Sequence, residues 1–158
     1  MVGMSYGKFR VVLLTPRAKL LDCRCGSLIL PAHDGQLGVL RNHCPLLSKM
    51  GFGIMQVLEI PDRPNAFFII NGGFVRISEN HVTVLAYDVI TFEGKTPQEV
   101  EAMISHAQSV VAGQEYIRTQ QKTIDIQEAR LIVRMAEMAS VKRPNSAESK
   151  QKSAEPPL

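Results

Sequence analysis

Hydrophobic and polar residues follow two different periods along the chain, and the change from one to the other lies near residue 93. Between residues 8 and 90 the apolar positions form short runs rich in valine, isoleucine, leucine and phenylalanine, each closed by turn-forming residues. Turn signals spaced about 8 to 12 residues apart, with no helical pattern between them, are typical of antiparallel strands in a sandwich or barrel. This half of the chain therefore predicts an antiparallel β-sandwich.

One tripeptide inside this region predicts a tight turn. Asn71-Gly72-Gly73 separates two apolar runs, and glycine adopts positive φ without a steric penalty. We therefore expect a hairpin at this point, with one strand on either side.

Beyond residue 93 the apolar residues fall at helical spacing, and glutamine, glutamate and alanine replace glycine. The spacing predicts a first helix over residues 97–112, with Thr96 as N-cap, Glu99 completing a capping box and Gly113 as a C-terminal glycine cap. A second amphipathic run predicts a helix over residues 115–139. Two helices with a short connection predict an antiparallel two-helix hairpin.

The predicted fold class is an N-terminal antiparallel β-sandwich followed by a C-terminal antiparallel helical hairpin. The composition shifts divide the chain into a sandwich domain at 1–91, a helical hairpin at 92–140 and a tail at 141–158. The tail has almost nothing to bury, which predicts disorder.

Composition excludes several classes of protein. The formal charge of +3 and the absence of a basic run interleaved with aromatic residues argue against a dedicated nucleic-acid binder. No 18-residue apolar run and no secretory signal pattern is present, so we expect a soluble protein without direct membrane insertion. Its 3 cysteines, an odd number, argue for reduced thiols rather than a disulfide framework.

A cluster of chemically versatile residues raises the hypothesis of a metal site or a small hydrolase. Its members are Cys23, Cys25, His33, His43 and Cys44. The spacings C-x-C and H-x9-H differ from the usual zinc pattern, and cysteine also packs as a small hydrophobe. We expect no metal, no cofactor and no catalytic residue, with the hydrolase or metal-binding protein kept as an alternative.

A phosphate-binding loop is the second site hypothesis. "EGKT" at residues 93–96 resembles its end, but Val89 stands where the loop needs glycine. Helix capping by Thr96 explains this segment better.

The second predicted helix carries a row of basic residues. They are Arg118, Lys122, Arg130 and Arg134. Such a row is either a solvated helix face or a surface that docks on an acidic partner.

Three longer stretches carry a family resemblance. "LPAHDGQLGVLRNHCPLL", then "GFGIMQV", then "FFIINGGFVRISENHVTVLA" resemble, in the same order, the motifs of the epsilon subunit of F-type ATP synthases, called delta in mitochondria. The match covers about residues 8 to 90, and the two-helix segment follows where the family has it.

The resemblance implies a β-sandwich of about ten strands at the foot of the central stalk, bound to the gamma subunit and to the c-ring. It implies a non-catalytic rotor subunit, peripheral to the cytoplasmic face of the energy-transducing membrane. Its c-ring docking loop would contain His33, Asp34, Gly35, Gln36, Arg41 and Asn42, with His43 and Pro45 as oriented structural residues. The helical hairpin would contact the catalytic beta subunits through the basic row and inhibit ATP hydrolysis.

The sequence also departs from the family pattern. Some relatives bind ATP through "[IL]-D-x-x-R-A" at the start of the first helix, where this chain reads "KTPQEVEA". Arg41-Asn42 replaces the usual Pro-Gly before His43, and Gln36 stands where an acidic residue is common. A free-standing sandwich adaptor with some other acidic partner is a further alternative.

Overall fold

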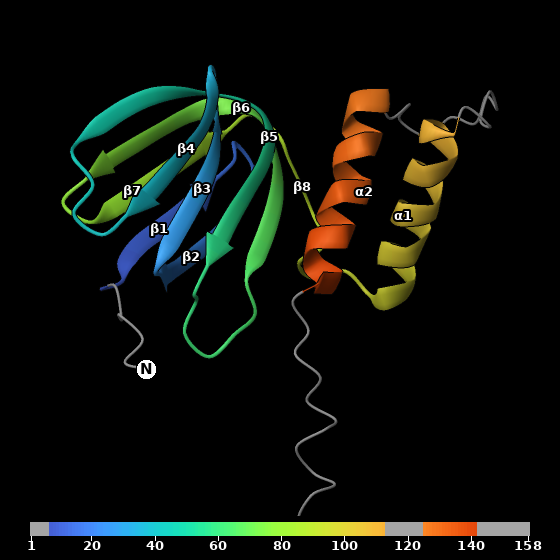
Figure 1. Cartoon of the computed structure of the whole chain (residues 1–158), viewed down its shortest axis with the longest axis horizontal. Helices are drawn as coiled ribbons and strands as arrows, with labels where there is room; N and C mark the ends of the chain where they lie inside the picture. Colours follow the sequence, from blue (N-terminus) through green and yellow to red (C-terminus); the bar gives the residue numbers. More distant parts are fainter. Residues whose placement is uncertain (1–6, 113–124, 142–158) are drawn as a thin grey trace, which may run out of the picture.

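The computed structural model describes residues 7–112 and 125–141, and it contains a β-sandwich followed by two helices (Figure 1). The strands are β1 (Phe9–Leu14), β2 (Lys19–Cys25), β3 (Ser27–Ala32), β4 (Gly35–Leu40), β5 (Leu46–Leu58), β6 (Ala66–Ser78), β7 (His81–Ala86) and β8 (Val89–Thr91). The helices are α1 (Pro97–Val111) and α2 (Ile126–Val141). The predicted fold class, sandwich then helical hairpin, is confirmed.

The strands form one sheet in the order β2-β1-β7-β6-β5-β3-β4, with β8 paired to β6. The β1–β7 pair is parallel and the other pairs are antiparallel. Strands β5 and β6, of 13 residues each, continue from one layer of the sandwich into the other. This continuity gives 8 strands within the described ranges, instead of the expected ten. The inner faces enclose one apolar core that includes Phe9, Leu28 and Phe68.

The expected hairpin at Asn71-Gly72-Gly73 is wrong, because β6 runs unbroken through these three residues. The chain reverses later, at Glu79 and Asn80, where β6 meets β7. Gly73 has a φ of 134°, and a Cβ there would overlap the carbonyl oxygen of Leu85. The glycines therefore allow β7 to pack closely against β6 where β6 bends. In the sequence alone, such a bend has the same glycine pattern as a turn.

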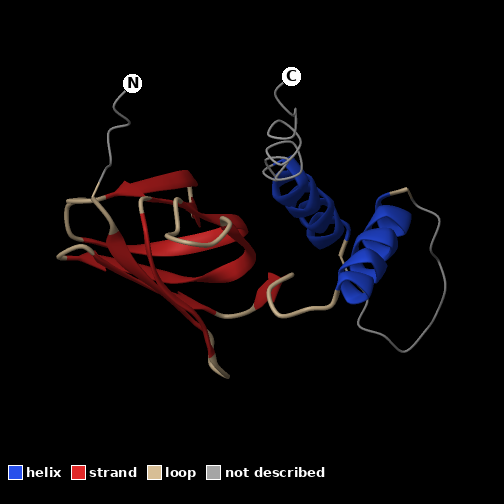
Figure 2. Cartoon of the chain, turned by 90° about the horizontal axis from the view of Figure 1, so that it is seen from below, coloured by secondary structure: helices blue, strands red, loops and turns tan. Residues whose placement is uncertain are grey.

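The helical hairpin packs on the outer face of β5 and β6 through α2, and α1 lies beyond α2 (Figures 1 and 2). Ile54 and Ile69 of the sheet form a second apolar cluster with Ala129, Ile132 and Met135 of α2. Ala107 of α1 joins the same cluster. The hairpin is thus folded against the sandwich through a narrow apolar seam.

The expected first helix agrees with the structure, whereas the expected second helix is wrong at both ends, because Asp125 lies outside any helix, α2 begins only at Ile126 and it runs two residues past 139. Helix α1 spans Pro97–Val111 with Ala112 as its C-cap, and α2 ends at Val141. Gly113, residues 115–124 of the expected second helix and the tail from residue 142 lie outside the described residues.

The capping box at the start of α1 is confirmed. The backbone N–H of Thr96 donates to Glu99 Oε2 at 2.7 Å, and the backbone N–H of Glu99 donates to Thr96 Oγ1 at 3.3 Å. The bond from the Thr96 backbone, together with one from its hydroxyl, lowers the pKa of Glu99 below its ordinary value. The contribution of ionised Glu99 to stability is therefore present at neutral pH and is lost as pH falls through its folded-state pKa.

Replacing Thr96 with alanine is expected to weaken the first turn of α1 by about 1 kcal/mol, because an N-cap acceptor is lost. Hydrogen exchange at the backbone amides of the first turn of α1 measures this change. Ser105→Ala, at an exposed position on the same helix, is the control and should leave these rates unchanged. Equal rates in Thr96→Ala and the parent chain would contradict the prediction.

Candidate functional site

The segment expected to form one docking loop is a β-hairpin. Strands β3 and β4 pair from Ala32↔Gly35 to Ser27↔Leu40, and only His33 and Asp34 form the turn. The expectation of a single loop over residues 33–42 is therefore wrong. Its two halves lie at opposite ends of β4, about 17 Å apart at 3.4 Å per residue.

The first half is the His33 tip, which we define as residues 33–36. All four residues are exposed. The backbone N–H of His33 donates to the carbonyl of Lys49 at 3.3 Å, which attaches the tip to β5. The tip therefore presents His33, Asp34 and Gln36 on a supported turn at one end of the sandwich (Figure 1).

The second half is the Asn42 loop, which we define as residues 41–45. Asn42 has a φ of 64°, and its backbone N–H donates to Asn80 Oδ1 at 2.6 Å. Asn80 Nδ2 donates back to Asn42 Oδ1 at 3.2 Å, and the Asn80 carbonyl accepts from the backbone N–H of Arg10 at 3.0 Å. One asparagine of the β6–β7 turn thus joins this loop to β1.

The histidine of the Asn42 loop is oriented by a local bond. His43 Nδ1 lies 2.7 Å from the carbonyl oxygen of Cys44, so the protonated Nδ1 donates to it. Cys44 is exposed, with its Sγ 3.9 Å from the same nitrogen, and Pro45 follows it just before β5. The structural roles of His43 and Pro45 stay predictions.

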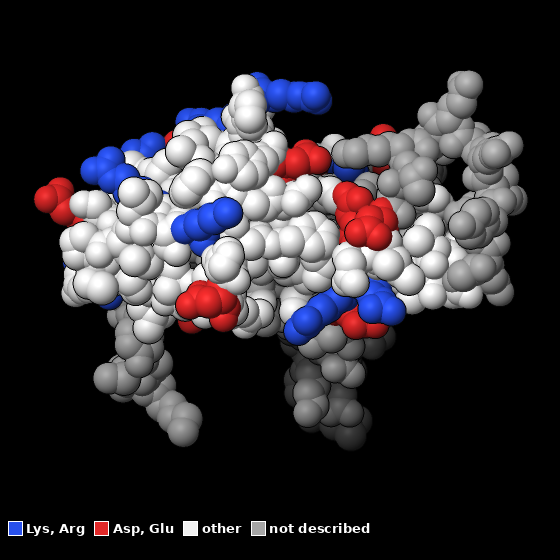
Figure 3. All heavy atoms as spheres, turned by 90° about the horizontal axis from the view of Figure 1, so that it is seen from above, with Lys and Arg blue, Asp and Glu red and all other residues white. Residues whose placement is uncertain are grey.

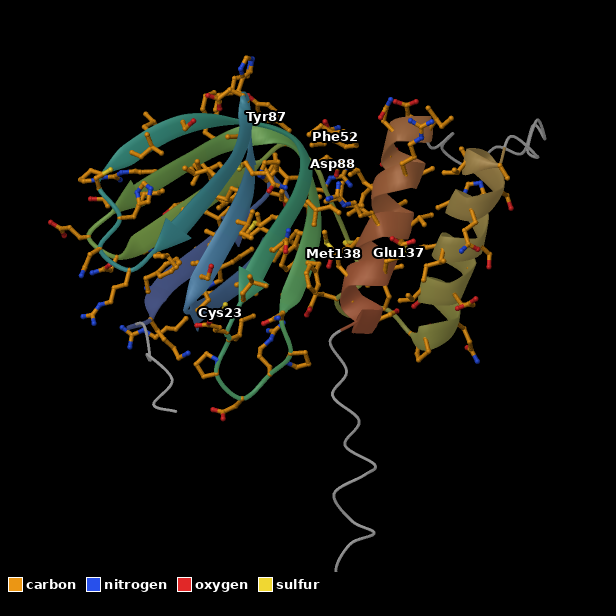
Figure 4. All side chains as sticks on the ribbon, viewed as in Figure 1. Cys23, Phe52, Tyr87, Asp88, Glu137 and Met138 are labelled. Carbon is orange, nitrogen blue, oxygen red and sulfur yellow. The ribbon has the colours of Figure 1, made fainter. Side chains whose placement is uncertain are left out.

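The other members of the metal hypothesis are not brought together. Cys23 lies near the lower end of the sandwich in Figure 4, whereas the turn that carries His33 stands at its upper end in Figure 1. Cys25 is fully buried, and burial raises the pKa of its thiol to about 12. Burial also raises the pKa of Cys23. Within residues 7–112 and 125–141, no group of three or more His, Cys, Asp or Glu side chains could hold a metal ion.

Half of the basic row can be placed. Arg130 and Arg134 are exposed on α2, one turn apart, and Arg118 and Lys122 lie outside the described residues. Figure 3 shows side chains of both signs scattered over one face of the molecule instead of one large patch. The role of the basic row stays a prediction.

Sequence reasoning missed an outer apolar face on the layer that the hairpin leaves uncovered. Leu47, Phe74, Leu85 and Tyr87 are 74%, 43%, 51% and 62% exposed. Phe74 is paired across the strands with Leu85, and its ring meets that of Tyr87 edge-on at 6.3 Å. A strand with one buried and one solvent-exposed face normally alternates apolar and polar residues, but β6 carries apolar residues on both faces. This departure was the signal in the sequence that could have revealed the outer apolar face. Exposed Lys49 and Arg76 share this face, opposite Phe74 and Leu47, so two cations interrupt the apolar surface. Exposed apolar side chains gathered in this way mark an interaction site.

Comparison with known families identifies the sandwich. Residues 8–92 match the model of the "ATP synthase, Delta/Epsilon chain, beta-sandwich domain". The chain belongs to this family.

Relatives in several organisms are similar to the chain beyond the sandwich. An ATP synthase epsilon chain of Synechococcus is 34% identical over 132 residues, covering 82% of this chain and 94% of the relative. The chloroplastic ATP synthase epsilon chain of Pisum sativum is 32% identical over 101 residues, covering 64% and 72%. A chain in the Euglena gracilis mitochondrial ATP synthase has a TM-score of 0.51 at 13% identity, covering 89% of this chain and 84% of that one, which shows the fold alone.

Family membership settles the class of protein. The chain is a non-catalytic rotor-stalk subunit of an F-type ATP synthase, within the peripheral F1 sector. No helix in the described part of the chain is long and apolar enough to cross a membrane.

Proposed function

We propose that the sandwich couples the c-ring to the gamma subunit, with the His33 tip on the ring and the outer apolar face on gamma. The single observation that carries this assignment is the β3–β4 hairpin, which presents a polar turn at one end of the sandwich. A polar turn suits polar loops of a ring, and an apolar face that also carries Lys49 and Arg76 suits a permanent stalk partner. The subunit then works peripherally at the cytoplasmic face of the energy-transducing membrane.

The Asn42 loop has a supporting part in this assignment. Its hydrogen bonds to Asn80 hold Asn42, with Arg41 next to it in the chain, near the outer apolar face, since β5, whose second residue is Leu47, begins directly after the loop. We assign these two residues to the gamma side instead of the ring side, because they lie at the far end of β4 from the tip.

Reversing the charge of the tip is expected to uncouple the enzyme. In the reconstituted holoenzyme, Asp34→Lys should reduce gradient-driven ATP synthesis several-fold, because one mispaired charge costs on the order of 1 kcal/mol or more at an interface. Glu101→Lys, with the same change of charge on exposed α1, is the matched control. Synthesis at the parental rate in Asp34→Lys would argue against the tip as the ring contact.

A second proposal concerns the helical hairpin, which we infer can leave the sandwich and inhibit ATP hydrolysis at the catalytic beta subunits. The hairpin and sandwich cores are separate clusters, and the buried part of the seam between them consists of Ile54 and Ile69 of the sheet, Ala107 of α1, and Ala129, Ile132 and Met135 of α2. Exposed Arg130 and Arg134 would meet acidic residues of the catalytic head.

A chain ending at Thr91 is expected to raise ATP hydrolysis more than synthesis in the assembled complex. The sandwich core stays complete without the helices, since its buried residues all precede residue 91. In the full chain, Arg130→Glu with Arg134→Glu should reproduce the effect, and Gln127→Glu on the same helix should not. Equal rates of ATP hydrolysis in complexes with the full and the shortened chain would contradict the inhibitory role.

A further inference from the structure

The main strand order of the described sheet ends in β2 and β4, while the short strand β8 lies off this order, and the edges at β2 and β4 are protected differently. Strand β2 carries Lys19, Asp22 and Arg24, and Asp22 binds Arg10 at 2.9 Å and Lys19 at 3.0 Å. Charged edge strands of this kind resist pairing with other chains. Strand β4, "GQLGVL", has no charged residue and no proline. Charged side chains therefore protect the β2 edge against pairing, whereas the β4 edge has no such protection.

The register shows which backbone groups of β4 face outward. A two-residue turn closes the hairpin at the hydrogen-bonded pair Ala32↔Gly35, and bonded and non-bonded pairs alternate from there. Gln36, Gly38 and Leu40 therefore direct their N–H and C=O groups away from β3. The carbonyl of Leu40 accepts from the N–H of His43 at 3.2 Å, as an outward group can. No described strand pairs with the outer groups of Gln36 and Gly38.

The surroundings of this edge leave room for a further strand. Neither β3 nor β4 contains a charged residue, so an uncharged segment could pair with β4 without the cost of desolvating a charged side chain of these strands. A Cβ built on Gly38 meets no atom within 4 Å. Leu40, at the end of β4, is 49% exposed.

We propose that the β4 edge binds an extended, uncharged segment of the gamma subunit as an additional strand of the sheet. This mode takes affinity from main-chain hydrogen bonds and specificity from alternate side chains. The proposal rests on the proposed function, because β4 joins the ring-facing His33 tip to the Asn42 loop. The edge leads to the proposed gamma-facing surface through the Asn42 loop, which folds back on exposed Leu40 through the His43 N–H and continues into β5, where Leu47 is exposed.

Gamma fits this edge better than a second copy or the ring. A second copy would pair its own β4 with this β4, antiparallel about a two-fold axis. That copy would then lie between the His33 tip and the Asn42 loop, the two ends of β4 that dock on other subunits. The ring is assigned to the polar tip, which needs no extended strand.

Two substitutions at one position test the proposal. Gly38→Pro removes a single outward N–H and leaves the bonds to β3 intact, since proline is tolerated at edge positions whose N–H faces outward. Gly38→Ala keeps that N–H and adds one methyl group in open space. With the full chain and ATP synthase depleted of this subunit, we expect Gly38→Pro to raise Kd at least tenfold, about 1.4 kcal/mol. Gly38→Ala should stay within about twofold.

Thermal melting of both isolated variants checks that the sandwich is still folded. Gln36→Pro is the second variant, and because Gln36 also belongs to the ring-facing His33 tip, its affinity is measured for purified gamma alone, where loss of an outward N–H should weaken binding in the same way. Parental affinity in both proline variants would overturn the proposal. Failure of the parent chain itself to bind would instead refute the docking function, so the two failures are distinguishable.

Hydrogen exchange identifies the occupant. The amides of Gln36 and Gly38 should become protected when the full chain binds purified gamma. Protection that rises with the concentration of the isolated chain would assign the edge to a second copy, and protection only in the presence of the c-ring would assign it to the ring. Either result would overturn the assignment to gamma.

Discussion

Replacing Ile132 with aspartate is expected to release the helical hairpin while the sandwich stays folded. Ile132 is 1% exposed and lies in the seam with Ile54 and Ile69. A buried isoleucine contributes about 1.5–3 kcal/mol, and an unpaired carboxylate there adds a desolvation cost. Ile132 is one of only 6 buried residues in this cluster, so we expect the two costs together to detach the hairpin. The sandwich core contains no residue of α2 and should be unaffected.

Hydrogen exchange resolves this outcome element by element. In Ile132→Asp the amides of α1 and α2 should lose protection, whereas those of β1 and β7 should keep it. Gln127→Asp, at an exposed position of the same helix, is the matched control. Parental protection of both helices in Ile132→Asp would show that the seam does not hold the hairpin.

Replacing Gly73 with alanine is expected to destabilise the sandwich by at least about 3 kcal/mol or to prevent folding. The φ of 134° is unfavourable for any residue with a Cβ, and the added methyl group overlaps the backbone of Leu85 and Ala86. Because the obstruction is backbone, rotation of a side chain cannot relieve it. The pairing of β6 with β7 must therefore shift.

Gly38→Ala is the matched control for this substitution. It adds the same methyl group to a strand glycine that has no neighbour within 4 Å. Urea unfolding should show a lower midpoint for Gly73→Ala and a midpoint close to the parent for Gly38→Ala. A Gly73→Ala midpoint equal to the parent would mean that β7 does not approach as closely as the structure shows.

The fold class was predictable because its signals are local. The two periods of the hydrophobic pattern separate strands from helices, and Thr96 and Glu99, three residues apart, fix the start of α1. The seam was partly predictable as well, since Ala129, Ile132 and Met135 fall on one helical stripe.

The errors arose where distant contacts decide the structure. Gly72-Gly73 has the local appearance of a turn, but it is the carbonyl of Leu85 that requires glycine at position 73. The segment 33–42 has the polar composition of a loop, but its register with β3 makes most of it a strand. The bond between Asn42 and Asn80 joins residues 38 positions apart, and nothing in either local sequence indicates it.

The outer apolar face illustrates a different limit. Exposed Leu47 and Leu85 look like core residues in a sequence, because burial in a partner and burial in a core favour the same side chains. Only the structure shows that these side chains lie on the uncovered layer. The sequence alone could therefore indicate a partner through the family resemblance, but not the surface that binds it.

We infer that this rotor subunit is held in the complex by its sandwich. Affinity purification of the tagged full chain, and of a chain ending at Thr91, from its own cells tests this claim most directly. We expect both forms to retain gamma, the ring subunit and the catalytic subunits, in fixed proportion to the tagged chain. Loss of these subunits from the shortened chain would contradict docking through the sandwich, and their absence from both forms would contradict the rotor function itself.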